Sequence, residues 1–502
     1  MTMHINLSPE MEGFIKSKVN SGFYSDVTEV IRDAVRRLQA EEDRIVAEPV
    51  ALKKGSDQLN PGEGEGNTRE NLNAMTQRTM DSTHSGKPLH PGVIMASFKD
   101  ELLSSKLAPP LAGVRVLEAT TRLAGPFCAS MLGEFGAEVI KIELPGKGDP
   151  FRVTGTKSAA GSSFNFLNDN RNKKAITLDL RKKKGAAIFK RLISDCDILV
   201  ENFRPKTLEK WGVGYETLKS IKEDLIFVSI SAYGQDGPYR DRPGVGRIAY
   251  GVAGIAYLTG EKEGPPLLPG TSALGDYLSG LYGALGALLA YIARGRSGRG
   301  QCVDATLYES VFRMLDELAP VYAKTGFVRE RSGAAHPYSV PNNHYLTKDD
   351  HWVVIVCTVD SMFARLAAIM EQPDLPARFP TLAERVKGRD ELEGIVAAWV
   401  RSLTRDELLR RCHAGDLTAG PINSIADIFA DEHFRARNTL LEFDHPQAGK
   451  VVVPNVSPRL SATPGEVRTL GVELGQNNIE IYRDRLGFSE GEMSQLQMEG
   501  VI

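Results

Sequence analysis

The stretch Val114-Arg-Val-Leu-Glu-Ala119, followed after one helix length by Gly136-Ala-Glu-Val-Ile-Lys-Ile-Glu143, decides the fold of this chain. Both segments are rich in β-branched and apolar residues, as buried parallel strands are, and residues 126–135 between them have the pattern of a helix. Further strand-like segments follow at 174–180, 197–201 and 225–231, each separated by helical sequence. This alternation predicts an α/β fold with a Rossmann-like lobe.

The acid that closes the second strand, Glu143, is a feature of nicotinamide-cofactor sites. The turn after the first strand, Thr120-Thr-Arg-Leu-Ala-Gly-Pro126, has one glycine instead of the G-x-G-x-x-G pattern. Because those glycines let the backbone approach a pyrophosphate, their absence disfavours a dinucleotide cofactor.

A second informative stretch is Gly270-Thr-Ser-Ala-Leu-Gly-Asp276-Tyr-Leu-Ser-Gly280. Residues 277–293 carry no charge and alternate small residues with leucines, which predicts a helix packed tightly on most sides. Asp276 then lies in the first turn, where the helix dipole favours the ionised carboxylate. Such a carboxylate is a candidate nucleophile, and an aspartate that merely caps the helix is the structural alternative.

The composition is that of an ordinary globular protein with several domains: 502 residues, 42% hydrophobic and 25% charged. A net charge of -3 gives no general preference for nucleic acid or membranes. The five cysteines are widely spaced without a C-x-x-C pair, which predicts neither disulfides nor a zinc site. No signal peptide is apparent, and the apolar run after Asp276 is at the short limit for a membrane span. We therefore expect a soluble cytoplasmic protein that holds no metal and has no membrane partner.

Residues 1–44 have the pattern of a small separate unit. His4-Ile-Asn-Leu-Ser8 alternates like a strand, Ser8-Pro9 begins a helix and Ser25 caps a second one. So short a unit cannot bury a core alone and needs a partner copy. The words Gly22-Phe-Tyr-Ser-Asp26 and Ile31-Arg-Asp-Ala-Val-Arg-Arg-Leu38 resemble the ParD-type antitoxins, which have the ribbon-helix-helix fold.

This resemblance implies a dimer whose paired strands enter the major groove of operator DNA. The outward residues of that strand, expected to contact DNA, are His4, Asn6 and Ser8. The resemblance also implies a ParE-type toxin as a partner of residues 1–94; a plain dimerisation module is the alternative. Residues 45–108 are polar and glycine-rich, as a flexible antitoxin tail or linker is.

From residue 109 to the end, the chain resembles the class III CoA-transferases, the CaiB/BaiF family. The words that carry the resemblance are Leu123-Ala-Gly-Pro126, Gly136-Ala-Glu-Val-Ile-Lys-Ile-Glu143, Gly148-Asp149, Asn172-Lys-Lys-Ala-Ile-Thr-Leu-Asp179, Val200-Glu-Asn-Phe-Arg-Pro205, Gly234-Gln-Asp-Gly-Pro238, Leu274-Gly-Asp276 and Gly298-Arg-Gly-Gln301. The resemblance implies a homodimer. Within one chain, we expect a Rossmann-like CoA-binding and catalytic lobe at 109–335, a smaller α/β lobe at 336–445, and a C-terminal segment at 446–502 that returns to the large lobe.

The resemblance further implies that Asp276 is the nucleophile of a CoA-transferase. Asp276 would form a mixed anhydride with the donor acyl group and then an aspartyl-CoA thioester, and the substrates would be an acyl-CoA and a small carboxylic or dicarboxylic acid. The residues implied to bind CoA are Leu123, Ala124, Leu178, Arg181, Asn202, Phe203, Arg204 and Lys210. The structural alternative is that the apolar members are core and the basic members are solvated surface.

Three departures from the family pattern concern the substrate. Leu144 stands where formyl-CoA transferases carry a CoA-contacting arginine. Pro243-Gly-Val-Gly-Arg247 lacks the acid usual in many relatives, which makes Arg247 a candidate for recognising a carboxylate. The stretch His336-Pro-Tyr-Ser-Val-Pro-Asn-Asn343 replaces a glycine-run loop, and its sequence disfavours oxalate as a substrate.

Two other functions compete with CoA transfer. An α-methylacyl-CoA racemase of this fold needs a histidine base, and no histidine lies between His90 and His336. The other alternative is a DNA-binding antitoxin and autoregulator that carries the enzyme body as a passenger.

Overall fold

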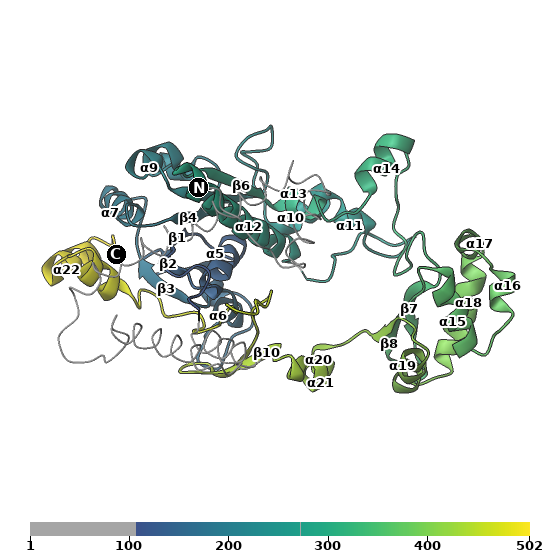
Figure 1. Ribbon diagram of the computed structural model, residues 1–502. Coiled ribbons are helices and arrows are strands. Elements are labelled where there is room, and N and C mark those ends of the chain that lie inside the picture. Colours follow the sequence, from purple (N-terminus) through teal and green to yellow (C-terminus); the bar gives the residue numbers. More distant parts are fainter. Residues whose placement is uncertain (1–106, 272) are drawn as a thin grey trace, which may run out of the picture. The chain divides into compact units, whose positions relative to one another are not determined.

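The computed structural model describes residues 107–271 and 273–502 (Figure 1). The ribbon-helix-helix module, its expected DNA contacts His4, Asn6 and Ser8, and nearly all of the linker at 45–108 lie outside the described residues. Contacts divide the chain into two units, Met1–Leu103 and Ser104–Ile502. The second unit contains all of the described residues.

A six-stranded parallel sheet forms the centre of the large lobe. Its strands lie in the order β3-β2-β1-β4-β5-β6. Their bounds are β1 Arg115–Ala119, β2 Glu138–Glu143, β3 Lys173–Thr177, β4 Ile198–Glu201, β5 Ile226–Ser231 and β6 Cys302–Thr306. This is the Rossmann order, which reverses direction between β1 and β4. The predicted Rossmann-like α/β fold is confirmed.

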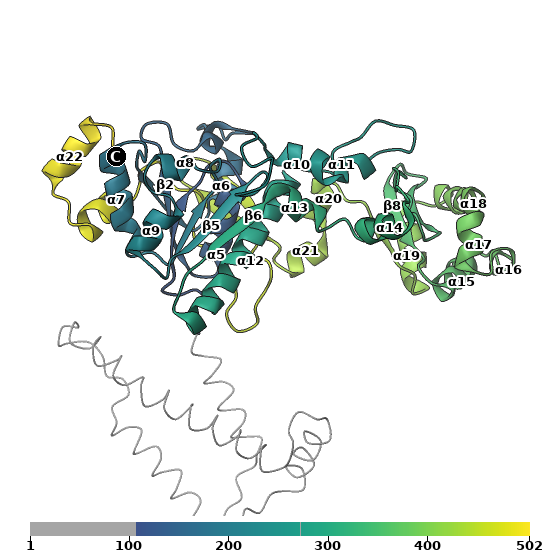
Figure 2. The same ribbon diagram turned by 90° about the horizontal axis from the view of Figure 1, so that it is seen from above.

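Helices cover both faces of this sheet. Side chains alternate along a strand, so Leu117 of β1 joins the core under α7 (Lys183–Ile193) and α9 (Tyr215–Ile221). Its neighbour Val116 joins the core under α5 (Ala124–Glu134) and α12 (Leu274–Ser297). Figure 2 shows α12 running alongside α5 and β6.

Helix α12 differs from the prediction that it is packed on most sides. Its small residues make one close face, where a Cβ on Gly280 would lie 2.6 Å from the carbonyl oxygen of Ala124 in α5. Its large residues make an exposed stripe, with 43–58% of each accessible in the single chain: Leu281, Leu285, Leu289 and Ile292. The prediction is wrong for the single chain because the small and large residues segregate to different faces.

Shorter elements complete this lobe. They are η1 Pro150–Val153, α6 Phe164–Asp169, α8 Thr207–Lys210, α10 Gly246–Ala253, α11 Ile255–Leu258, α13 Leu307–Phe312 and α14 Leu318–Thr325. Of these, η1, α8, α10 and α13 contribute residues to the walls of the cavities at the candidate site.

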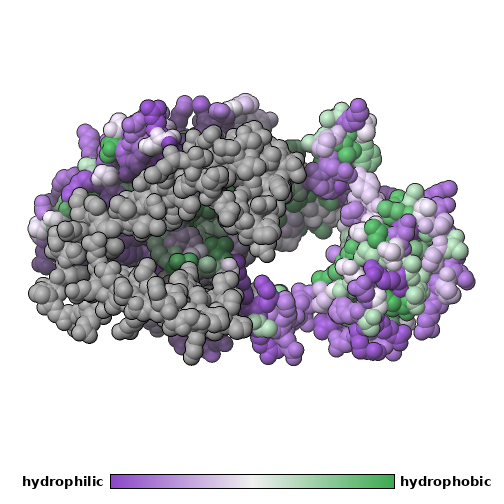
Figure 3. Space-filling view, in the orientation of Figure 1, coloured by the Kyte–Doolittle hydropathy of each residue, from purple (hydrophilic) through white to green (hydrophobic). Residues whose placement is uncertain are grey.

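A second core forms around an antiparallel sheet of β7 (Asn342–Leu346), β8 (Trp352–Val356) and β9 (Ala419–Pro421). Figure 3 shows apolar side chains scattered among hydrophilic ones over this lobe. Its helices are α15 Asp360–Ile369, α16 Leu375–Arg378, α17 Leu382–Lys387, α18 Arg389–Arg401 and α19 Arg405–Ala414.

After α20 (Ile425–Ala430) and α21 (Glu432–Ala436), β10 (Leu440–His445) and β11 (Gly449–Pro454) form a hairpin. Side chains of η2 (Ile479–Arg485) and α22 (Glu490–Met498) then join the core under α7. The domain boundaries expected at 335 and 445 stay predictions. Within the described part of the chain, no helix combines the length and apolarity needed to cross a bilayer.

Candidate active site

The candidate site opens where the sheet order reverses, between the carboxyl ends of β1 and β4. Here the two strand-end loops are fastened to each other by one side chain. The Asn202 side-chain amide accepts a hydrogen bond from the Thr121 N–H at 2.9 Å and donates one to the Thr121 carbonyl at 2.8 Å. Ligands of open α/β sheets bind in the crevice at this reversal point.

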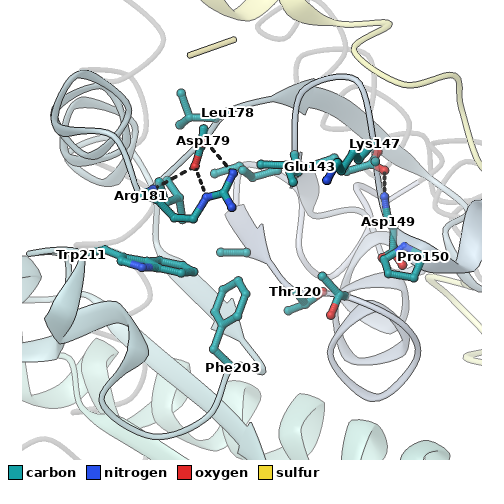
Figure 4. Close-up of a pocket in the computed structure, with 16 residues that line it drawn as sticks. Thr120, Glu143, Lys147, Asp149, Pro150, Leu178, Asp179, Arg181, Phe203 and Trp211 are labelled. Carbon is teal, nitrogen blue, oxygen red and sulfur yellow. Dashed lines mark hydrogen bonds and ion pairs between the residues drawn. The ribbon is translucent and has the colours of Figure 1, made fainter. Parts of the chain in front are cut away.

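A cavity of about 520 Å³ lies on the β2–β3 side of this point (Figure 4). Phe203 and Trp211 meet edge to face with ring centroids 5.1 Å apart. Opposite them the Arg181 guanidinium is held by both carboxylate oxygens of Asp179, at 2.7 and 2.8 Å, beside Leu178. Aromatic and apolar walls with two cationic residues, Arg181 and Lys147, suit a purine ring and its phosphate.

A larger cleft of about 730 Å³ shares Thr121 and Phe203 with that cavity. The predicted CoA residues Leu123, Ala124, Asn202 and Arg204 line it together with Asp276. Lys210 is the exception, since it lines a neighbouring cavity of about 650 Å³ that shares Arg204 with the cleft. The other predicted CoA residues are therefore brought together around two joined cavities.

Asp276 is the third residue of α12, and Ala273 is the residue that precedes the first turn. The alternative of an aspartate that only caps the helix therefore does not hold. Burial raises the pKa of Asp276 to about 6, against the lowering effects of its own backbone N–H and the charge of Arg122. Burial thus outweighs the dipole effect expected from the sequence, yet the carboxylate remains mostly ionised at neutral pH.

The cleft is strongly cationic. Asp276 is the one carboxylate among the described residues that line it, against five arginines at 122, 204, 240, 242 and 247. Arg240 pairs with Asp241, and Arg242 stacks on the Tyr239 ring at 3.6 Å. The other three arginines are Arg122, Arg204 and Arg247, and within the described ranges no carboxylate forms a salt bridge with their side chains. Such a cleft concentrates phosphates and carboxylates.

The loop that carries Arg122 is held by a buried acid, Asp149. Arg122 has a left-handed backbone with φ 69°, and its N–H donates to the Asp149 carboxylate at 3.0 and 3.2 Å. The buried Lys141 ammonium pairs with the same carboxylate at 2.9 Å. Burial alone would lower the pKa of Lys141, but the charges of Asp149 and Glu118 outweigh it and raise that pKa. The buried charged network of Asp149, Lys141 and Glu118 thus fixes the backbone of the loop that carries Arg122.

Glu143, the acid that invited a cofactor interpretation, is engaged inside this network. Its carboxylate accepts hydrogen bonds from the Asp149 N–H at 2.8 Å and from Arg152 at 2.6 and 2.7 Å. Because its carboxylate oxygens accept these hydrogen bonds, Glu143 stabilises the loop and is not free to bind a ribose hydroxyl, as the acid of a nicotinamide-cofactor site does.

Several residues of the site were missed at the level of sequence: Arg122, Asp149, Trp211, Gly246 and Tyr250. Asp149 stood in the quoted word Gly148-Asp149, and Trp211 directly follows Lys210, so both had a signal. Gly246 stood in the quoted stretch Pro243-Gly-Val-Gly-Arg247, but nothing in that stretch indicates its contact with a residue of another helix. No histidine is among the described residues that line the cleft, so these walls offer no base for a racemase.

Two family models match the chain. Residues 111–478 match CoA-transferase family III, and residues 2–66 match the bacterial antitoxin of the ParD toxin-antitoxin type II system. The parallel sheet with cavities at its reversal point is the arrangement of an α/β protein that binds its ligand there, and the arginines of the cleft favour an anionic ligand.

Individual relatives agree with the larger match. The chain is 47% identical over 397 residues to the succinyl-CoA--L-malate CoA-transferase beta subunit of Chloroflexus aurantiacus. This alignment covers 78% of the present chain and 98% of that relative. It is 44% identical over 403 residues to the succinyl-CoA--D-citramalate CoA-transferase of the same organism, covering 80% and 100%. The crystal structure of a CAIB/BAIF family protein from Brucella suis aligns with TM-score 0.67 and 33% identity, covering 75% and 100%.

The chain belongs to CoA-transferase family III. It is therefore an enzyme of the CoA-transferase class.

Proposed function

We propose that this protein transfers CoA between two dicarboxylic acids, with succinyl-CoA as donor and a malate-like hydroxy acid as acceptor, through covalent intermediates on Asp276. The relatives named for succinyl-CoA, malate and citramalate support these substrates. The observation that carries the mechanism is the single carboxylate, Asp276, in a cleft whose described walls otherwise offer arginines.

The chemistry proceeds without net proton transfer. The Asp276 carboxylate attacks the thioester carbonyl, which forms a mixed anhydride and releases CoA thiolate. The thiolate then attacks the aspartyl carbonyl, which forms the Asp276–CoA thioester and releases succinate. The acceptor carboxylate attacks this thioester, and the thiolate finally attacks the acceptor carbonyl of the new anhydride. The product thioester leaves and Asp276 is regenerated.

The two joined cavities suit the two ends of the donor. The nucleotide lies against Leu178, Arg181 and the Phe203–Trp211 pair, and the chain then passes the Thr121–Asn202 bridge toward Asp276. Lys210 and Arg204, in the neighbouring cavity, are within reach of a phosphate at its edge. A CoA thioester substrate is consistent with the cytoplasmic location expected from the sequence.

Intact-mass spectrometry tests the mechanism. We expect the protein incubated with succinyl-CoA and trapped with hydroxylamine to carry an adduct at Asp276, which the Asp276→Ala variant lacks. The exposed Asp236 is a control, because Asp236→Ala removes a nearby carboxylate that does not line the cleft. Normal adduct formation in the Asp276→Ala variant would contradict the proposal.

We also propose a homodimer in which a second copy covers the exposed stripe of α12. Stripes of large apolar side chains at helical spacing are characteristic of interfaces, and Leu285 and Leu289 are 47% and 58% exposed. Light scattering of Leu285→Glu against the unchanged chain tests this. A dimer that persists at the same concentration would argue against the stripe as the interface.

A second role is proposed for the amino-terminal segment, because residues 2–66 match the antitoxin model. His4, Asn6 and Ser8 would read operator DNA, and residues 1–94 would bind a ParE-type toxin. Electrophoretic mobility shifts on the chain's own promoter, with His4→Ala and Asn6→Ala, test the DNA contact. Equal binding by the variants would rule these residues out.

A further inference from the structure

Helix α10 turns one face toward the start of α12. Gly246 is its first residue and Tyr250 lies one helical turn later, so both fall on this face. Both are buried, and Tyr250 has no accessible surface. This face contacts Asp276 and the turn before it, and Tyr250 also packs against Val311 of α13.

Gly246 lies directly against the Asp276 carboxylate. A Cβ at position 246 would lie 2.0 Å from Oδ2 and 2.9 Å from Cγ of Asp276, a separation that atoms cannot adopt. The carboxylate therefore occupies the space that any side chain at 246 would need. It also lies at the amino-terminal end of α10, where no side chain caps the helix and the first backbone N–H groups have no partner within it.

Tyr250 holds the turn that leads into Asp276. Its hydroxyl accepts a hydrogen bond from the Gly275 N–H at 3.1 Å and donates one to the Thr271 carbonyl at 3.2 Å. Gly275 permits this close approach, since a Cβ there would lie 3.3 Å from the Tyr250 ring. One face of α10 thus sets both where α12 begins and where the carboxylate of its third residue can lie.

We propose that Gly246 and Tyr250 are positioning residues for the Asp276 nucleophile, Gly246 by leaving room for one carboxylate rotamer and Tyr250 by fixing the backbone that carries it. This inference rests on the proposed function, in which Asp276 attacks the thioester. A nucleophile held in a near-attack geometry avoids an orientational cost, and a misplacement of about 1 Å costs on the order of 100-fold in rate.

Single-turnover kinetics of the full chain with succinyl-CoA test the proposal. For Gly246→Ala we expect CoA release to slow about 100-fold while the KM for succinyl-CoA stays within about twofold, because the nucleotide cavity is untouched. The matched control is Gly251→Ala in the same helix, where a Cβ meets nothing within 4 Å. That variant keeps the rate of the unchanged chain.

The pH profile separates positioning from general loss of structure. The unchanged chain loses activity as pH falls through about 6, the pKa that burial gives Asp276. In Gly246→Ala the carboxylate is pushed toward solvent, so this limb moves down toward the ordinary aspartate value of about 4. Tyr250→Phe, which keeps the ring and removes one oxygen, lowers kcat about tenfold at unchanged KM.

The outcomes are distinct. A Gly246→Ala protein with the rate and pH limb of the unchanged chain overturns the inference. If that variant does not fold, Tyr250→Phe decides, and an unchanged kcat there overturns it. Full transfer by Asp276→Ala is a different result, because it removes the proposed function itself.

Discussion

At the scale of single residues, Asp276 combines two opposing demands. In the proposed mechanism its carboxylate must be ionised to attack a thioester, yet burial in the cleft raises its pKa to about 6. Its own backbone N–H and the charge of Arg122 lower that pKa, but they only partly offset the burial. A reactive carboxylate of this kind costs the folded protein stability.

Replacing Asp276 by asparagine removes that cost. The folded-state pKa lies above the ordinary value of 3.8, so the ionised group destabilises the fold above pH 6 and has no such effect well below pH 4. We expect Asp276→Asn to raise the free energy of unfolding at pH 7.5 by about 1–3 kcal/mol. Urea unfolding at pH 7.5 and pH 4 measures this. An equal gain at both pH values would show that ionisation is not the cause.

Arg247 is a second residue of the cleft with a distinct expected role. It lines the cleft one residue after Gly246, and its side chain forms no salt bridge with a carboxylate in the described part of the chain. A charge-assisted hydrogen bond to the remote carboxylate of succinyl-CoA is worth about 1.5–3 kcal/mol. A binding free energy of about 1.4 kcal/mol corresponds to a tenfold change in affinity. We therefore expect Arg247→Ala to raise the KM for succinyl-CoA about 10- to 100-fold.

Butyryl-CoA, which lacks that carboxylate, is the control substrate for Arg247→Ala. Its KM should change less than about twofold if the lost interaction is with the remote carboxylate. A parallel loss with both thioesters would instead assign Arg247 to CoA.

At the scale of elements, the close contact of α12 with α5 depends on residues without side chains. A Cβ on Gly280 would lie 2.6 Å from the Ala124 carbonyl, at the turn that lines the cleft. Gly295 lies in the same helix, and a Cβ there meets nothing within 4 Å. The two glycines therefore have opposite roles.

We expect Gly280→Ala to destabilise the protein by about 1–3 kcal/mol, since the extra atom forces α12 and α5 apart. Gly295→Ala should stabilise it by about 0.5–1 kcal/mol, since alanine loses less backbone entropy in a helix. Chemical unfolding of both variants checks the pair. Similar effects of the two substitutions would mean that the helix contact is not what Gly280 serves.

At the scale of the whole molecule, the two matched families divide the chain unequally. The match to the CoA-transferase family spans residues 111–478, and the match to the ParD antitoxin spans residues 2–66. The named walls of the two joined cavities begin at Ala119, within the first of these matches.

We expect a chain that begins at Ser104 to transfer CoA with kcat/KM within about twofold of the full chain. Steady-state transfer from succinyl-CoA to malate measures this, and the operator-binding assay on the same protein should show no shift. Loss of transfer on truncation would reveal that the amino-terminal part supports the enzyme.

Local pattern was sufficient to locate most strands of the large lobe. The segments predicted at 197–201 and 225–231 became β4 and β5 within one residue, because buried parallel strands have a compact apolar signature. Asp276 could be singled out because it precedes a long uncharged run. The residues expected to bind CoA were instead inferred from short segments that resemble the CoA-transferase family, because no periodicity in the sequence marks them.

The order of elements, the fold class and the position of a candidate nucleophile could therefore be inferred from the amino-acid sequence alone, since each depends on neighbours along the chain. Which residues meet became known only from the three-dimensional fold. The Thr121–Asn202 bridge spans 81 residues, and the Gly246–Asp276 contact joins two helices. Such contacts depend on the order of the strands in the sheet and on how the helices pack. Because strand order and helix packing leave no periodic pattern along the sequence, these contacts could not be predicted from it.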